Sequence, residues 1–205
     1  MDLNKVHISW FPLLHKIHQE PLNTFLKETI YTRGIRENRE DIFKVFSKPL
    51  CNIKMVIVTK PRLNFAEHLA DFSVIDKMVE KGFNKSEWNK EGVFFLETSL
   101  TRSLEGDTDE EYWKDFIDTV IKYISQEHPC IWMFWGTAYK LHNVKKDYIL
   151  VNSYNRELLE HIPINKDWNY TFISPDIIDY DFEKGDYFYK ANRILNKLNI
   201  KQIKF

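Results

Sequence analysis

GVFFLETSL, residues 92–100, is the stretch that decides the fold, because it is a short and nearly unbroken apolar run. IKMVIV at 53–58 and CIWMFWG at 130–136 repeat the same pattern on either side of it. Runs of this length without polar alternation are typical of strands that are covered on both faces of a parallel sheet. The sequence therefore predicts a buried parallel sheet that includes these three strands.

Helical segments are predicted between and around the strands. EEYWKDFIDTVIKYIS at 110–125 places its apolar side chains on one stripe, and YFYKANRILNKLN at 187–199 is amphipathic in the same way. EPLNTFLKETIY at 20–31 and EDIFKVFS at 40–47 predict two more helices, each with acidic residues near its start. Strands that alternate with helices predict the α/β class.

Composition predicts one globular domain over residues 1–205. The chain has 205 residues and is 43% hydrophobic, which is enough for one sizeable core and too little for two comfortable domains. The formal net charge is −1. Proteins that bind the phosphate backbone usually carry a basic face, so charge gives no support for DNA binding.

Neither a metal nor a cofactor is expected. Cys51 and Cys130 form no CxxC pair, and His15 and His18 share a predicted helix face without a third ligand nearby. The first residues lack the pattern of a signal peptide, and IWMFW at 131–135 is far too short to span a bilayer. We therefore expect a cytoplasmic protein that does not enter a membrane.

Several blocks of sequence resemble family-1 uracil-DNA glycosylase. They are FSV at 72–74, GVFFLETSLT at 92–101, YWKDFIDTVI at 112–121, MFWG at 133–136 and DYFYKANRILNKL at 186–198. The resemblance implies a three-layer α/β/α sandwich with a short central parallel sheet. It also implies an ancestral activity in which uracil is flipped out of the duplex and its glycosidic bond is cleaved.

The first catalytic motif of that family is replaced here. The family has Gly-Gln-Asp-Pro-Tyr-His after the first strand, and its aspartate orients water and opposes the cationic sugar. The resemblance places Lys60 at the glutamine and Pro61 at the aspartate, and proline can neither activate water nor carry negative charge. Leu63 replaces the tyrosine that shapes the pocket against thymine, and Asn64 replaces the histidine.

Two further pocket positions differ in how well they are kept. Glu97 stands where the family has its uracil-reading asparagine, and an ionised carboxylate only accepts hydrogen bonds. Glu97 is expected to pair with Lys60 or to be solvated, and the alternative is a displaced general base. Phe72 matches the family's stacking residue, although a core phenylalanine explains it equally well.

The second catalytic motif, His-Pro-Ser-Pro-Leu, has lost its histidine. Counting back from YFYKAN, Ser174 and Pro175 match, and Phe172 replaces the histidine. Asp176 then falls where the leucine wedge should be, with Ile177 next along.

A rival register places Tyr154 and Leu158 at this motif, and it lacks the histidine as well. The favoured register implies extra residues within 140–168, which predicts an added loop or hairpin.

Acidic runs occupy two segments that the resemblance places on the DNA side. EGDTDEE at 105–111 has five acids in seven residues, and DIIDYDFEKGD at 176–186 has five acids against one lysine. Such clusters repel phosphates and suit a basic protein surface. The residues assigned to this DNA-facing or partner-facing side are Glu105, Asp107, Asp109, Glu110, Glu111, Asp176, Ile177, Asp179 and Asp181.

Three functions are compatible with these residues. The leading hypothesis is a catalytically inactive member of the fold that binds a protein partner in DNA metabolism. The first alternative is a non-catalytic binder of DNA or of modified-base DNA, for which Leu63 leaves room in the pocket. The second is a glycosylase of changed specificity that uses Glu97 as base and Lys60 as electrophile or nucleophile.

Overall fold

A five-stranded parallel sheet forms the centre of the protein. The computed structural model describes residues 5–18, 42–60, 84–101, 109–150, 160–177 and 179–205. The strand order is β2-β1-β3-β5-β4, and all four neighbouring pairs are parallel. The strands are β1 (Met55–Thr59), β2 (Val93–Glu97), β3 (Ile131–Trp135), β4 (Asp147–Leu150) and β5 (Asn169–Ser174).

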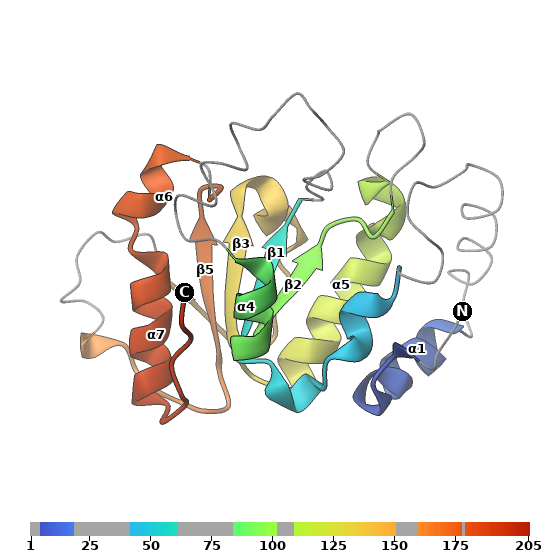
Figure 1. Cartoon of the computed structure of the whole chain (residues 1–205), viewed down its shortest axis with the longest axis horizontal. Helices are drawn as coiled ribbons and strands as arrows, with labels where there is room; N and C mark the ends of the chain where they lie inside the picture. The colour runs from blue at the N-terminus through green and yellow to red at the C-terminus, as the bar shows by residue number, and fades with distance from the viewer. Residues whose placement is uncertain (1–4, 19–41, 61–83, 102–108, 151–159, 178) are drawn as a thin grey trace.

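Helices cover both faces of this sheet, as Figure 1 shows. Along β1 the side chains alternate, so that Val56 and Val58 belong to one buried cluster while Met55 and Ile57 belong to the other. The first cluster includes α1 and α5, and the second includes α4, α6 and α7. The helices are α1 (Phe11–His18), α4 (Lys85–Glu91), α5 (Glu110–Glu127), α6 (Tyr180–Lys184) and α7 (Tyr187–Lys197).

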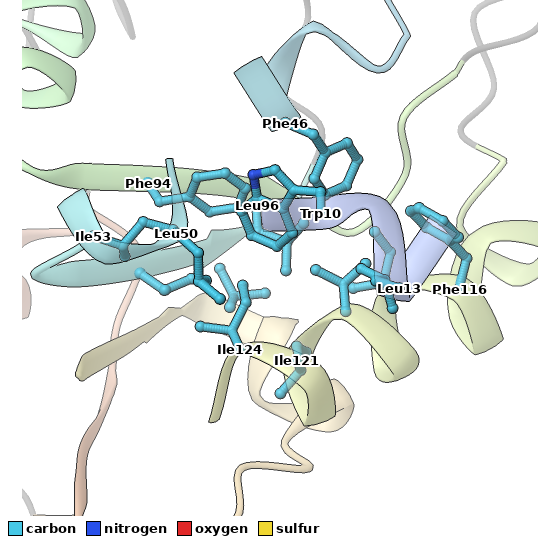
Figure 2. Close-up of a cluster of buried hydrophobic side chains, with 14 of the residues drawn as sticks. Trp10, Leu13, Phe46, Leu50, Ile53, Phe94, Leu96, Phe116, Ile121 and Ile124 are labelled. Carbon is cyan, nitrogen blue, oxygen red and sulfur yellow. The ribbon is translucent and has the colours of Figure 1, made fainter. Parts of the chain in front are cut away.

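Aromatic side chains fill the cluster on the α5 face. Trp10 is fully buried and stacks on Phe94 of β2 with ring centroids 5.5 Å apart. Phe46 meets the same indole edge-on with ring centroids 5.1 Å apart. Figure 2 shows the two side chains next to each other. The indole N–H donates to the backbone oxygen of Lys48 at 2.7 Å, so the buried polar atom is satisfied.

The cluster on the α7 face is closed by the last residues of the chain. Phe205 stacks on Phe188 of α7 with centroids 4.3 Å apart and meets Trp88 of α4 edge-on at 5.2 Å. The side-chain amide of Asn192 donates to the backbone oxygen of Ile203 and accepts from its N–H, each at 2.8 Å. These contacts hold the C-terminal segment across α4 and α7.

The predicted class and layers are confirmed, including the strands in 53–58, 92–100 and 130–136 and the helices in 110–125 and 187–199. The helix predicted in 20–31 lies outside the described residues. The helix predicted in 40–47 was wrong in its described part, which is the short 3-10 helix Lys44–Ser47 (η3). Lys48 is extended because Pro49 follows it, and a residue before proline avoids the helical region.

Of the added loop or hairpin expected in 140–168, the hairpin was wrong in the described residues, and the added loop stays a prediction. This region contains β4, which pairs with β5 in parallel, and two parallel strands cannot form a hairpin. Both strands escaped prediction.

None of the helices in the described part of the chain has the length and apolar character needed to cross a membrane. The cytoplasmic location stays a prediction.

Candidate functional site

The carboxyl ends of the strands meet at one edge of the sheet, at the top of Figure 1. Thr59 ends β1 and lies opposite Glu97, which ends β2, in the parallel register. Trp135 ends β3 and lies opposite Ser174, which ends β5. Open parallel sheets bind their ligands in the crevice outside these ends, so this carboxyl edge is the candidate site.

Lys60 follows β1 directly and pairs with an acid of α5. Its Nζ lies 3.8 Å from Oε2 of Glu110, and the lysine side chain is 57% exposed. Oε1 of Glu110 accepts a hydrogen bond of 2.5 Å from the hydroxyl of Thr98. The N–H of Thr98 donates to the backbone oxygen of Thr59 at 2.9 Å. The start of α5 is therefore joined to the ends of β1 and β2.

Glu97 pairs with Lys85, so the expected Glu97–Lys60 pair was wrong. The Nζ of Lys85 lies 3.2 Å from Oε1 of Glu97 and 5.5 Å from the ring centroid of Phe95. Lys85 is the first residue of α4, and α4 runs back along the sheet before β2 begins. The first residue of the helix is thus brought beside the last residue of the strand.

Asp109 is a structural residue, contrary to its expected place on a partner-facing surface. Only 3% of it is exposed, and its Oδ2 accepts from the hydroxyl of Thr101 at 2.8 Å. That hydroxyl accepts in turn from the indole N–H of Trp113 at 2.7 Å. Asp109 precedes α5, where a negative charge is favoured by the helix dipole.

The rest of the first acidic run is only partly on the surface. Glu110 is half-buried and engaged by Thr98, whereas Glu111 is exposed in the first turn of α5. Glu105 and Asp107 lie outside the described residues. Within the described part of this run, Glu111 alone presents a largely solvated carboxylate.

Ile177 is buried, so its assignment to the surface was wrong as well. It is 1% exposed and belongs to the cluster on the α7 face, where an apolar side chain is stabilised by leaving water. Asp176 is half-buried, and its N–H donates to Oδ2 of Asp179 at 3.1 Å. Asp179 and Asp181 are exposed, and Asp181 pairs with Lys184 at 2.7 Å.

Phe172 lies inside the core, two residues before the end of β5. It is 2% exposed, and its ring meets Tyr187 of α7 edge-on with centroids 6.2 Å apart. A phenylalanine here supplies packing and no hydrogen-bond donor. Ser174, at the end of the strand, has its Oγ 3.3 Å from the backbone oxygen of Phe134.

Four predicted pocket residues lie outside the described residues, namely Pro61, Leu63, Asn64 and Phe72. The site role of these residues, and of Lys60, Glu97 and Phe172, stays a prediction.

Sequence reasoning missed Lys85 and Thr98, which hold the two acids at this edge. A helix start at 85 could have been recognised from Asn84, whose side chain caps α4 by accepting from the N–H of Glu87. Two exposed tyrosines at the carboxyl edge were missed too: Tyr112 in α5 is 42% exposed, and Tyr139 is 45% exposed in η5 (Gly136–Leu141), directly after β3.

The described part of the carboxyl edge can bind through charge and aromatic surface. Its two most central acids already face cations, in the pairs Lys60–Glu110 and Lys85–Glu97. Within the described ranges no group of three or more His, Cys, Asp or Glu side chains is placed to hold a metal ion.

Relatives of known sequence are uracil-DNA glycosylases. The enzyme of Flavobacterium johnsoniae is 30% identical over 169 residues, which are 66% of this chain and 75% of the relative. The one of Oceanobacillus iheyensis is 27% identical over 231 residues, covering 98% of this chain and 94% of the relative. No model of a protein family matches the chain.

Solved structures of similar fold carry the same name. The crystal structure of mimivirus uracil-DNA glycosylase matches with a TM-score of 0.64 and 15% identity, covering 99% of this chain and 88% of that one. The UNG of Nitratifractor salsuginis matches with a TM-score of 0.55 and 12% identity, covering 94% and 93%. At these identities the likeness shows the fold.

Proposed function

Because the chain belongs to the uracil-DNA glycosylase family, we propose that it is a member that excises no base and acts by binding a protein partner in DNA metabolism. Glycosidic cleavage needs a carboxylate that orients water and opposes the developing cation. The family resemblance puts Pro61 where that carboxylate belongs.

The observation that carries the proposal is the pairing of charges at the carboxyl edge. The family resemblance puts Glu97 at the position of the pocket asparagine, and its Oε1 lies 3.2 Å from the Nζ of Lys85. Glu110 is held by Lys60 and by the Thr98 hydroxyl. Each of these carboxylates is thus already engaged by a cation of the protein itself. Loss of one well-placed catalytic group typically costs about 10²–10³ in rate.

The surface around these pairs suits a protein. Tyr112 and Tyr139 are both more than two-fifths exposed at this edge, and tyrosine is enriched at protein interfaces and among their hot spots. Glu111 beside Tyr112 and the exposed Asp179 add negative charge. The partner surface that fits this edge is basic, with apolar area to cover the tyrosine rings.

One observation favours a second function, the non-catalytic binding of DNA. The acidic run before α5 offers less repulsion than its sequence indicates, because Asp109 is internal and Glu110 is paired. The side chains of Lys60 and Lys85 are 57% and 54% exposed at the same edge and could approach phosphates.

One experiment separates these functions. The purified full chain is incubated with single- and double-stranded oligonucleotides that contain uracil, 5-hydroxymethyluracil or only normal bases. Formation of abasic sites and retention of a complex are both measured. The uracil-DNA glycosylase of Oceanobacillus iheyensis serves as the active control on the same substrates.

Absence of both excision and complex supports the protein-partner function. A complex without excision supports the DNA-binding function, and its affinity should then rise with base modification and fall in Phe72→Ala. Excision of any base would overturn both proposals. If the Lys60→Ala and Glu97→Gln variants then lost that excision, the activity would belong to these two side chains.

A further inference from the structure

A depression lies at the amino ends of the strands, at the edge of the sheet opposite the carboxyl edge. Its volume is about 500 Å³, within the range of small-molecule sites. The segments that enter the strands line it, with Lys54 before β1, Gly92 before β2, Cys130 before β3 and Trp168 before β5. We name this depression the lysine pocket.

Five lysines and one carboxylate line the lysine pocket. The carboxylate is Glu91, whose Oε2 lies 3.8 Å from the Nζ of Lys201. The carboxyl ends of α4, α5 and α7 also converge here, each worth about half a negative charge. These ends, Glu91 and the Glu87 that pairs with Lys90 together offset about two thirds of the lysine charge, so the pocket stays positive. The five lysines are Lys48, Lys54, Lys90, Lys166 and Lys201.

Some of these lysines have a structural role, and two have none that the described residues provide. Lys48 donates to the side-chain oxygen of Asn89 at 2.9 Å and to the backbone oxygen of Val93 at 3.2 Å. Lys90 pairs with Glu87. The ammonium groups of Lys54 and Lys166 have no hydrogen bond or ion pair to any residue that the structure describes.

The pKa of Lys48 agrees with an excess of positive charge. Burial first, and then the charge of Lys54, lower it from 10.5 to about 8. A neighbouring anion would oppose the second cause. An incoming phosphate therefore meets lysines whose charges repel one another in its absence.

An aromatic and aliphatic wall completes the pocket. Trp168 stacks on Tyr148 of β4 with centroids 6.0 Å apart and ring planes 8° from parallel, so its orientation is fixed. Leu195 of α7, with Leu198 and Ile200 after the helix end, adds apolar side chains to the same lining. A ligand for this pocket needs an anionic group for the lysines and a ring for the wall.

We propose that the lysine pocket binds a nucleoside phosphate, either free or as the phosphorylated end of a strand. Lys54 and Lys166 contact the phosphate, and the base lies against Trp168 and Leu198. This binding does not depend on the function proposed for the carboxyl edge.

Cys51 makes occupancy of the pocket measurable. It lines the pocket and is exposed, whereas Cys130, the other cysteine of the chain, is buried, which raises the pKa of its thiol. A ligand in the pocket should slow the reaction of Cys51 with a thiol reagent. The rate is measured with thymidine monophosphate, thymidine, inorganic phosphate, and one oligonucleotide with and without a terminal phosphate, and calorimetry of the same mixtures gives the affinity.

We expect thymidine monophosphate to protect Cys51 more strongly than thymidine or inorganic phosphate does. The double variant Lys54→Gln/Lys166→Gln should weaken binding by about tenfold or more, the scale of losing charge-assisted contacts. The matched control Lys122→Gln/Lys140→Gln removes two exposed lysines outside the pocket and should bind as the wild type does. Circular dichroism checks that each variant is folded.

Unchanged Cys51 reactivity and no heat with every phosphate would overturn the proposal, as would equal binding by the pocket variant and the wild type. If inorganic phosphate protected Cys51 as well as the mononucleotide does, the pocket would bind phosphate without recognising the base, and the nucleoside part of the proposal would be wrong. Protection by the phosphorylated oligonucleotide but not by the mononucleotide would identify a strand end as the source.

Discussion

Thr98 and Glu110 are joined by a hydrogen bond of 2.5 Å, from the threonine hydroxyl to the glutamate carboxylate. The bond links the residue after β2 to the first residue of α5, and Glu110 also faces Lys60 at 3.8 Å. The start of α5 is thus tied to the ends of β1 and β2 by contacts between side chains at the carboxyl edge.

Thr98→Val should destabilise the protein by about 1–2 kcal/mol, because the buried methyl group cannot donate and leaves a half-buried carboxylate oxygen less well solvated. Chemical denaturation measures the free energy of unfolding. Thr119→Val is the matched control, because its hydroxyl binds only the backbone oxygen of Asp115 within an exposed turn of α5. An equal loss in both variants would contradict a special role of Thr98.

Ile177→Ala should cost about 2–4 kcal/mol of stability, since the side chain is 1% exposed in the core cluster on the α7 face. The exposed residue Ile149 of β4, which is 49% exposed, provides the control Ile149→Ala with a much smaller expected loss. Thermal unfolding compares the two. A near-neutral Ile177→Ala would mean that this side chain is free to leave the core, as a DNA wedge has to be.

Asn169→Asp should be more damaging than its small change in shape implies. The side-chain amide donates to the backbone oxygens of Ser125 and Lys145, at 2.9 and 2.6 Å, and its oxygen accepts from the indole of Trp132. A carboxylate cannot donate to those two oxygens, and we expect a loss of about 2–4 kcal/mol.

Asn196→Asp, on the exposed side of α7, is the control for this substitution and should cost about 1 kcal/mol or less, the effect of a carboxylate near the carboxyl end of a helix. Both variants are compared by denaturant titration. Similar midpoints for the two would refute the importance of the buried amide.

Lys48 should make the protein more stable as the pH rises from about 8 to about 10.5. Burial and the charge of Lys54 lower its pKa from 10.5 to about 8 in the folded protein. Between these values the unfolded chain holds a proton that the folded chain has released, so the free energy of unfolding increases with pH. Below the folded pKa both states are protonated, and the difference is constant.

The measurement is the melting temperature of the wild type minus that of Lys48→Gln between pH 7 and pH 10. This difference should shift in favour of the wild type as the pH increases. Lys122→Gln, at an exposed position of α5, should give a flat difference. A flat or falling curve for Lys48→Gln would show that its pKa is not lowered.

The strands could be predicted where the sequence has an unbroken apolar run, because such a run indicates burial on both faces of a sheet. Every residue of IWMFW in β3 is buried, and β1 and β2 follow the same pattern. β5 escaped because Asn169 and Thr171 are fully buried despite their polarity. Asn169 is tolerated there because four hydrogen bonds from the surrounding chain satisfy its amide, and such partners are not visible in sequence.

For the candidate site, the sequence predicted which residues lie at the carboxyl edge but not which residues they contact. The strand ends placed Lys60 and Glu97 at the carboxyl edge, but their partners depend on where helices begin. Lys85 meets Glu97 because α4 starts there, and Glu110 meets Lys60 because α5 starts there. The lysine pocket could not be predicted, because its cations come from separate segments that only the folded sheet brings together.

The five residues of β1 lie between Lys54 in the lysine pocket and Lys60 at the carboxyl edge, which puts these two residues roughly 20 Å apart along the strand. All five are buried, and both neighbours bond to them in register along their length. A strand that is buried over its whole length and paired on both sides is expected to act as a rigid spacer between its two ends. A nucleoside phosphate at one end and a protein at the other should therefore bind together without competition and without cooperativity, each with the affinity it has alone.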